Sequence, residues 1–179
     1  MKIALIIAQN NFRDEEYEVP KKTFEDAGFE TTTLSKTTGI CTSKFKKTVQ
    51  ATDSIDNIDV ADYYAIVFIG GPGAVKFHKD VEAHLTCQEA INRGKVLAAI
   101  CIAPLTLVYA DVLEGKKATV WNQDGKQAEI MTQNGADFVD QDVVVEGKII
   151  TANGPMAAES FGKKILELLR PAIILVGKS

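Results

Sequence analysis

The sequence predicts a doubly wound α/β fold, with a mostly parallel sheet and helices on both faces, in a single domain over residues 1–179. Four apolar runs bounded by turn residues are typical of strands buried on both faces. They cover residues 3–8, 29–34, 65–69 and 96–100. Helical patterns lie between several of these runs, and strands alternating with helices favour crossover connections in one sheet.

Three helical patterns follow the strands. Residues 14–27 end at Gly28 and residues 80–92 end at Gly94, so each pattern has a glycine stop. Residues 103–110 form the third. Asp14 is a plausible N-cap, which puts Glu16 in the first helical turn. Between Gly39 and Ile58 the chain is polar and loosely alternating, which predicts a peripheral hairpin.

The C-terminal part predicts a hairpin and a last helix. Residues 143–150 alternate around Gly147 and indicate a hairpin with a short turn. Residues 157–169 form an amphipathic helix that we expect to stop before Pro171. The apolar tail over 171–176 is either an additional edge strand or a patch covered by a partner subunit.

Composition excludes several classes of protein. The chain has 179 residues, no internal repeat and no linker, which is the size of one α/β domain. A net charge of −4 without a block of like charge argues against a nucleic-acid partner. No apolar stretch is long enough for a membrane span, and the N-terminal one is too short for a signal peptide. The three cysteines lack disulfide-framework number and metal-ligand spacing, so we expect a reducing cytoplasm, no metal and no cofactor.

Cys101 lies where the strand over 96–100 ends and a helix begins. A residue at such a junction sits on a tight turn that needs small neighbours, and Ala99 and Ala103 satisfy this. The following helix would direct free N–H groups at the sulfur and favour the thiolate. The alternative is a small core residue, since free cysteine is often buried. The local sequence does not separate these two interpretations.

Two other segments should meet Cys101 at the carboxyl edge of the sheet, where parallel α/β sheets bind ligands. The glycines at 70, 71 and 73 follow a strand and would let backbone amides approach a ligand. Pro20 cannot donate to the carbonyl of Glu16, so a kink at that residue would turn its carboxyl toward Cys101, with a raised pKa if buried. We interpret the other charged residues here, Arg13, Asp14, Glu15 and Glu18, as a surface cluster.

Together, these motifs resemble the ThiJ/PfpI superfamily. The resemblance rests on residues 12–16 with Pro20, Gly70-Gly71, residues 98–104, residues 113–119 and residues 153–155. It implies a flavodoxin-like sandwich that forms a homodimer or higher homo-oligomer. It also implies that Cys101 is the nucleophile, that Glu16 is a protonated glutamate beside it, and that the amides of Gly71 and Ile102 form an oxyanion hole.

The chain departs from this pattern at the histidine. Some members place a histidine directly after the cysteine, where this chain has Ile102, and others place it in the segment that here reads Val120-Trp121-Asn122. His78 and His84 are the only histidines, and we interpret both as surface or helix-flanking residues, with His78 a minor candidate at the rim of the site. Trp121 could pack over the pocket, although a half-buried structural tryptophan is the more common case.

The resulting hypotheses differ in what Cys101 does. In the first, the protein is a glyoxalase- or deglycase-like enzyme acting on small reactive carbonyls or their glycated adducts, which need less help than amide cleavage. In the second, it is a redox sensor or stress chaperone in which Cys101 meets an oxidant and stops at the sulfinic stage. A cysteine protease or amidase, including a glutamine-amidotransferase type, needs a base that the motifs do not supply. We expect neither nucleic acid nor membrane as a partner.

Overall fold

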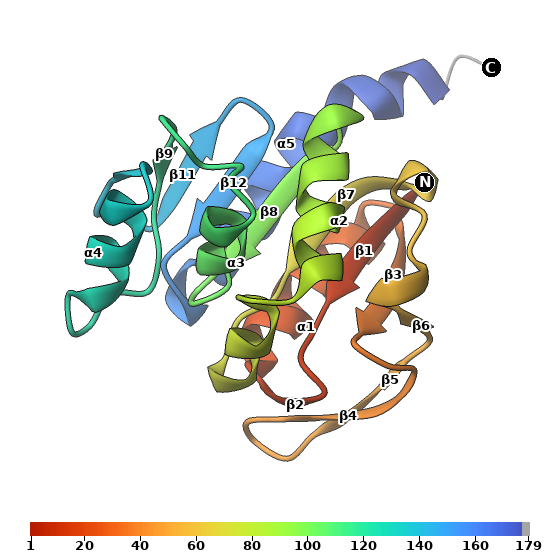
Figure 1. Ribbon diagram of the computed structural model, residues 1–179. Helices are drawn as coiled ribbons and strands as arrows, with labels where there is room; N and C mark the ends of the chain where they lie inside the picture. The colour runs from red at the N-terminus through yellow and green to blue at the C-terminus, as the bar shows by residue number, and fades with distance from the viewer. Residues whose placement is uncertain (177–179) are drawn as a thin grey trace.

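A seven-stranded sheet organises the molecule in the computed structural model, which describes the backbone of residues 1–176 and the side chains of residues 1–170. The strand order is β11-β12-β8-β7-β1-β3-β6, and all neighbours pair in parallel except the antiparallel β11–β12 hairpin (Figure 1). The predicted doubly wound fold is thus confirmed. The strand bounds are β1 Lys2–Ile6, β3 Glu30–Ser35, β6 Asp53–Ser54, β7 Tyr63–Phe68, β8 Val96–Ile100, β11 Val143–Glu146 and β12 Ile149–Ala152.

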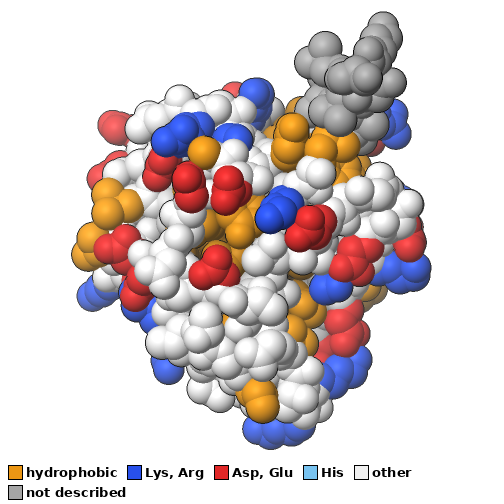
Figure 2. All heavy atoms as spheres, turned by 90° about the vertical axis from the view of Figure 1, so that its right-hand side faces the viewer, with side chains coloured by type: hydrophobic (Ala, Val, Ile, Leu, Met, Phe, Trp, Pro, Cys, Tyr) orange, Lys and Arg blue, Asp and Glu red, His pale blue; other side chains and the backbone are white. Residues whose placement is uncertain are grey.

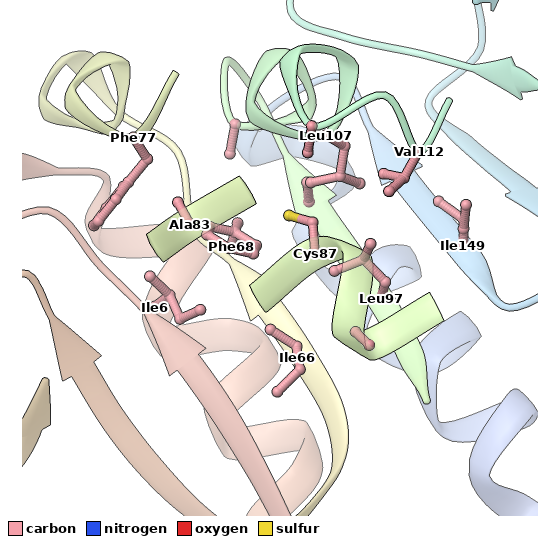
Figure 3. Close-up of a cluster of buried hydrophobic side chains, with 14 of the residues drawn as sticks. Ile6, Ile66, Phe68, Phe77, Ala83, Cys87, Leu97, Leu107, Val112 and Ile149 are labelled. Atoms are coloured by element: carbon pink, nitrogen blue, oxygen red, sulfur yellow. The ribbon is translucent and has the colours of Figure 1, made fainter. Parts of the chain in front are cut away.

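Helices cover both faces of this sheet because alternate strand residues point to opposite sides. Ile3 and Leu5 of β1 belong to one apolar cluster, while Ala4 and Ile6 belong to the other. The helices α1 (Asp14–Asp26) and α5 (Ala158–Val176) pack on the first side. The helices α2 (Val81–Asn92) and α3 (Pro104–Tyr109) pack on the second, where Cys87 and Leu107 meet β-strand side chains (Figure 3).

Smaller elements surround the sheet. The strands β2 (Asn10–Phe12), β4 (Gly39–Ser43) and β5 (Thr48–Ala51) form a separate three-stranded sheet at the carboxyl edge of β1 (Figure 1). The antiparallel β4–β5 pair is the predicted peripheral hairpin. The remaining elements are β9 Lys117–Ala118, β10 Asp137–Phe138, α4 Lys126–Gln133 and the 3-10 helices η1 Ile55–Asn57, η2 Val60–Asp62, η3 Pro72–Phe77 and η4 Pro155–Ala157.

Two expectations about helix ends are wrong. The last helix does not stop before Pro171 but continues to Val176, so an edge strand over 171–176 is excluded. Proline removes one N–H and its hydrogen bond, and here the helix continues without it. Whether a partner covers that tail lies outside the described side chains. Asp14 is not an N-cap: Arg13 holds that position, and Asp14 is the first helical residue.

The surface carries mixed charge. On the side shown in Figure 2, acidic and basic side chains alternate without forming a region of one sign. Among the described residues, no helix combines the length and the apolar character that a membrane crossing requires.

Candidate active site

The carboxyl ends of three adjacent strands bring the predicted site residues together. The strands β8, β7 and β1 are neighbours in the sheet, and the chain reverses its winding at β1, where β3 lies on one side and β7 on the other. Ligands bind at such a switch point in open α/β sheets. Cys101 follows β8, Gly70 and Gly71 follow β7, and Glu16 lies in α1, which follows β1 and β2.

Cys101 occupies a strained turn. Its φ angle is +64°, a left-handed conformation that is costly for a residue with a Cβ. The backbone is held on both sides: the Cys101 N–H donates to the Ala152 carbonyl at 2.8 Å, and the Cys101 carbonyl accepts from the Trp121 N–H at 2.8 Å. Its side chain is partly exposed, whereas Cys41 and Cys87 are fully buried. The structure therefore presents one cysteine to solvent among the three.

Glu16 is completely buried beside that cysteine. Gly70 separates the two side chains, and a Cβ on Gly70 would come within 2.5 Å of Glu16 Oε2 and 2.6 Å of Cys101 Cβ. The absence of a side chain at position 70 thus lets the carboxyl and the thiol adjoin. Neither carboxyl oxygen has a hydrogen-bond partner of good geometry among the described residues. The polar groups that act on it are the Cys101 thiol, the Arg13 charge, the Gly70 amide and the like charge of Glu15.

Burial dominates the protonation of this pair. It raises the pKa of Glu16 to about 7, against the opposing effects of Cys101 and Arg13. Burial and the Glu16 carboxylate raise the pKa of Cys101 to about 12, against the amides of Gly71 and Ile102. The Ile102 amide before α3 does lower the pKa of Cys101, as expected of the helix end, but desolvation and the like charge of Glu16 outweigh it and favour the thiol. The two groups titrate as a pair, and above pH 7 the remaining proton resides mainly on sulfur.

Two backbone amides face the sulfur, as the resemblance implied. The N–H groups of Gly71 and Ile102 both stabilise negative charge on Cys101. Gly71 has a φ of +101°, and a Cβ there would lie 2.5 Å from the Arg13 nitrogen, so only glycine fits. Two converging backbone donors of this kind are what an oxyanion hole requires.

A cavity of about 640 Å³ opens over the pair. Its size is within the range of small-molecule sites. Trp121 lines it, together with residues from five other parts of the chain. The residues around the cavity are Arg13, Glu16, Lys44, Gly71, Pro72, Val75, Cys101, Ile102, Trp121, Gln123 and Pro155.

The two histidines contact backbone carbonyl groups and do not line the cavity. His78 Nε2 is 3.2 Å from the Ile102 carbonyl oxygen, and His84 Nε2 is 2.8 Å from the His78 carbonyl oxygen. Burial lowers the pKa of His78, which favours the neutral ring. Its ring contacts backbone instead of the cavity, whose lining does not include it. The described residues also hold no group of three His, Cys, Asp or Glu side chains suited to a metal.

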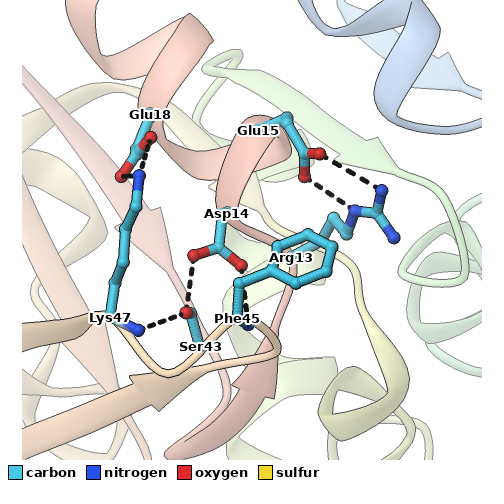
Figure 4. Close-up of polar contacts among 7 residues, drawn as sticks. All are labelled: Arg13, Asp14, Glu15, Glu18, Ser43, Phe45 and Lys47. Carbon is cyan, nitrogen blue, oxygen red and sulfur yellow. Dashed lines mark hydrogen bonds and ion pairs between the residues drawn. The ribbon is translucent and has the colours of Figure 1, made fainter.

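Sequence reasoning missed the contribution of Arg13, Asp14 and Lys44. Arg13 and Lys44 line the cavity, and Asp14 is only 3% exposed instead of belonging to a surface cluster. Of that cluster, Glu18 does lie at the surface, where it pairs with Lys47 (Figure 4). No local signal indicates Lys44, because it reaches the site only through the folding of the β4–β5 hairpin.

Comparison with known proteins identifies the family. The model of the DJ-1/PfpI family matches residues 1–168. The chain belongs to this family. It is 33% identical over 174 residues to protein/nucleic acid deglycase 2 of Escherichia coli, covering 94% of this chain and 97% of that protein. It is 29% identical over 170 residues to the putative cysteine protease YraA of Bacillus subtilis, with 94% and 98% covered.

A solved structure agrees in fold. The ThiJ/PfpI domain protein from Brachyspira murdochii superimposes with a TM-score of 0.90 at 26% sequence identity, covering 95% of this chain and 96% of that one. A family likeness of this extent establishes the flavodoxin-like architecture. A shared fold does not by itself define the chemistry, which depends on the residues of the site.

Proposed function

We propose that this protein is a cysteine-dependent enzyme that acts on small reactive carbonyls or glycated adducts, with Cys101 as nucleophile and Glu16 as proton shuttle. The observation that carries the proposal is the burial of one carboxyl group directly beside a partly exposed thiol on a strained turn. A carboxyl group with a pKa near 7 can accept and return a proton at neutral pH. The deglycase name of a relative at about a third identity supports the same class.

The first step follows from this geometry. The Glu16 carboxylate takes the thiol proton as the sulfur attacks an aldehyde carbon, and the carbonyl electron pair moves to oxygen. The amides of Gly71 and Ile102 bind the resulting oxyanion, which then takes the proton back from Glu16 to give a neutral hemithioacetal.

An α-oxoaldehyde can then react further without an external oxidant. Glu16 removes the proton from the former aldehyde carbon and returns it to the neighbouring carbonyl carbon, while the hydroxyl proton of the hemithioacetal passes to the neighbouring carbonyl oxygen, so one carbon is oxidised as the other is reduced. Water hydrolyses the thioester that this leaves on Cys101 and releases a 2-hydroxy acid with the free thiol. In the overall reaction, the dicarbonyl and one water molecule give the 2-hydroxy acid.

Lactate formation from methylglyoxal tests this proposal. We expect Cys101→Ser to lower the rate by roughly 10³-fold or more, because no other accessible thiol is present among the described residues. Cys87→Ala is the matched control, since Cys87 is fully buried in α2 and should leave the rate unchanged. Equal rates for wild type and Cys101→Ser, or no lactate above buffer, would contradict the proposal.

A redox role for Cys101 is the second candidate, and the selective exposure of this one cysteine favours it. The raised pKa of Cys101 counts against it, because oxidation proceeds through the thiolate. Mass spectrometry after mild peroxide treatment tests the redox role, which requires that Cys101 oxidises before Cys41 and Cys87. Peptidase chemistry has less support, because neither histidine reaches the cavity.

A further inference from the structure

The turn between β4 and β5, which carries the cavity-lining Lys44, is fixed by a buried acid. The Asp14 carboxylate accepts hydrogen bonds from Ser43 Oγ at 2.6 Å and from the Phe45 N–H at 3.2 Å (Figure 4). Ser43 Oγ in turn accepts from the Lys47 N–H at 3.0 Å. The Lys44 N–H donates to the Phe12 carbonyl at 2.8 Å. The backbone that carries Lys44 is therefore held in place.

Lys44 has no acidic partner among the described residues. Its side chain lines the cavity, and none of the ion pairs in the described part of the chain includes it. Lys47, three residues later, pairs with Glu18 at 2.7 Å on the outer surface. The free ammonium group of Lys44 is thus available to a molecule in the cavity.

Arg13 is a second cation at the same site. Its Nε lies 2.7 Å from Glu15 Oε2 and its Nη2 lies 3.2 Å from Glu15 Oε1, and the guanidinium stacks on the Phe45 ring at 5.0 Å (Figure 4). These contacts hold it rigidly, and Glu15 largely cancels its charge. Glu16, the other acid here, is completely buried beside Cys101 and becomes charged as the pH rises through about 7, whereas Lys44 is an exposed cation of the lining that forms no ion pair among the described residues.

We propose that this cavity selects carbonyl compounds that carry a carboxylate, and that Lys44, assisted by Arg13, binds that carboxylate while the carbonyl faces Cys101. The inference rests on the proposed function for the identity of the reacting carbonyl. The volume of about 640 Å³ supports it, because a three-carbon dicarbonyl would leave most of that space empty. A carbonyl adduct of a free amino acid has both the larger size and the negative group.

Alkylation of Cys101 tests charge selection without turnover. Iodoacetate and iodoacetamide have nearly the same size and differ by one carboxylate. The ratio of their rate constants at Cys101, measured by peptide mass spectrometry at pH 9, reports the preference for a negative group. We expect Lys44→Gln to lower this ratio about three- to fivefold, and 0.5 M salt to lower it in the wild type.

Because the ratio is compared between variants, the intrinsic difference in reactivity between the two reagents cancels. The repulsion of iodoacetate by Glu16 is common to these variants and cancels as well. Lys76→Gln is the matched control, because Lys76 is an exposed lysine of η3 that does not line the cavity. Glu15→Gln should raise the ratio by freeing the charge of Arg13. An unchanged ratio in Lys44→Gln, or an equal fall in Lys76→Gln, would overturn the inference.

The outcomes separate the two proposals. Lactate formation together with an unchanged ratio in Lys44→Gln overturns charge selection and leaves the enzyme standing. A ratio that depends on Lys44 without any lactate formation supports the anion site and contradicts the catalytic role. A Cys101 that reacts with neither reagent overturns both.

Discussion

At the scale of single residues, the pair formed by Glu16 and Cys101 determines what the site can do. A carboxyl group without a well-aligned hydrogen bond keeps its proton to a higher pH, because the buried charge is poorly compensated. The carboxylate in turn raises the pKa of the thiol. The nucleophile is therefore generated by proton transfer within the pair and is not a standing thiolate.

The pH dependence of catalysis should follow from this pair. We expect kcat/KM for methylglyoxal to rise with pH and to level off above an apparent pKa of about 7, because below that value both groups hold their protons. In Glu16→Gln the inflection near pH 7 should disappear and the rate should fall roughly 10²- to 10⁴-fold. A Glu16→Gln variant with the wild-type profile would contradict the role of Glu16 as base.

The free energy of unfolding, measured at two pH values, shows whether the Glu16→Gln variant is folded. Because the pKa of Glu16 is raised from 4.5 to about 7 on folding, the native state loses stability as the pH rises through that interval. Above pH 7 the cost is on the order of 3 kcal/mol at most. Glu16→Gln removes it, so its free energy of unfolding should exceed that of the wild type at pH 8 but not at pH 4.

At the scale of elements, the loop after β7 and the first turn of η3 determine how closely the parts of the site approach. Glycines at 70, 71 and 73 have no room for a Cβ: the nearest atom would lie at 2.5, 2.5 and 1.8 Å, respectively. For Gly71 and Gly73 the obstructing atoms are backbone atoms of the segment before α1. The loop is thus pressed against β2, which brings Glu16 against Cys101.

Gly70→Ala should therefore damage both stability and catalysis. Gly70 has no left-handed φ angle, so the effect is steric: the new Cβ would meet Glu16 Oε2, Cys101 Cβ and the Ile100 carbonyl oxygen within 2.6 Å. We expect a loss of about 1 to 3 kcal/mol in the free energy of unfolding and a large loss of activity. Urea titration and the lactate assay measure the two effects.

Gly28→Ala is the comparison for this variant. Gly28 has a φ of +84° and open space around it, so only backbone strain of about 1 kcal/mol is expected, with activity retained. If Gly70→Ala were as stable and active as Gly28→Ala, the close approach inferred at position 70 would be wrong.

At the scale of the whole molecule, apolar side chains remain exposed outside the cavity. Val81 and Leu85, one turn apart on α2, are 66% and 51% exposed, and Met156 beside the cavity-lining Pro155 is 97% exposed. Exposed apolar surface of this kind is common at interfaces between subunits. It is consistent with the homo-oligomer expected from the family resemblance.

We predict that the protein forms a homodimer or higher homo-oligomer in solution. The chain has a mass of 19.4 kDa, so light scattering coupled to size exclusion should give at least twice that mass at micromolar concentration. A single species of 19.4 kDa across the concentration range would contradict this prediction. The measurement is independent of activity and of the state of Cys101.

The sequence by itself determined the fold class, and the resemblance of its motifs to a known family implied the pairing of Cys101 with Glu16. Buried parallel strands produce unbroken apolar runs, and residues that follow adjacent strands must meet at one edge of the sheet. Only the tertiary structure decided that Asp14 is buried, that Lys44 reaches the cavity and that the Cys101 thiol has a raised pKa. These properties depend on desolvation and on contacts between segments some thirty to ninety residues apart, which no local pattern of residues encodes.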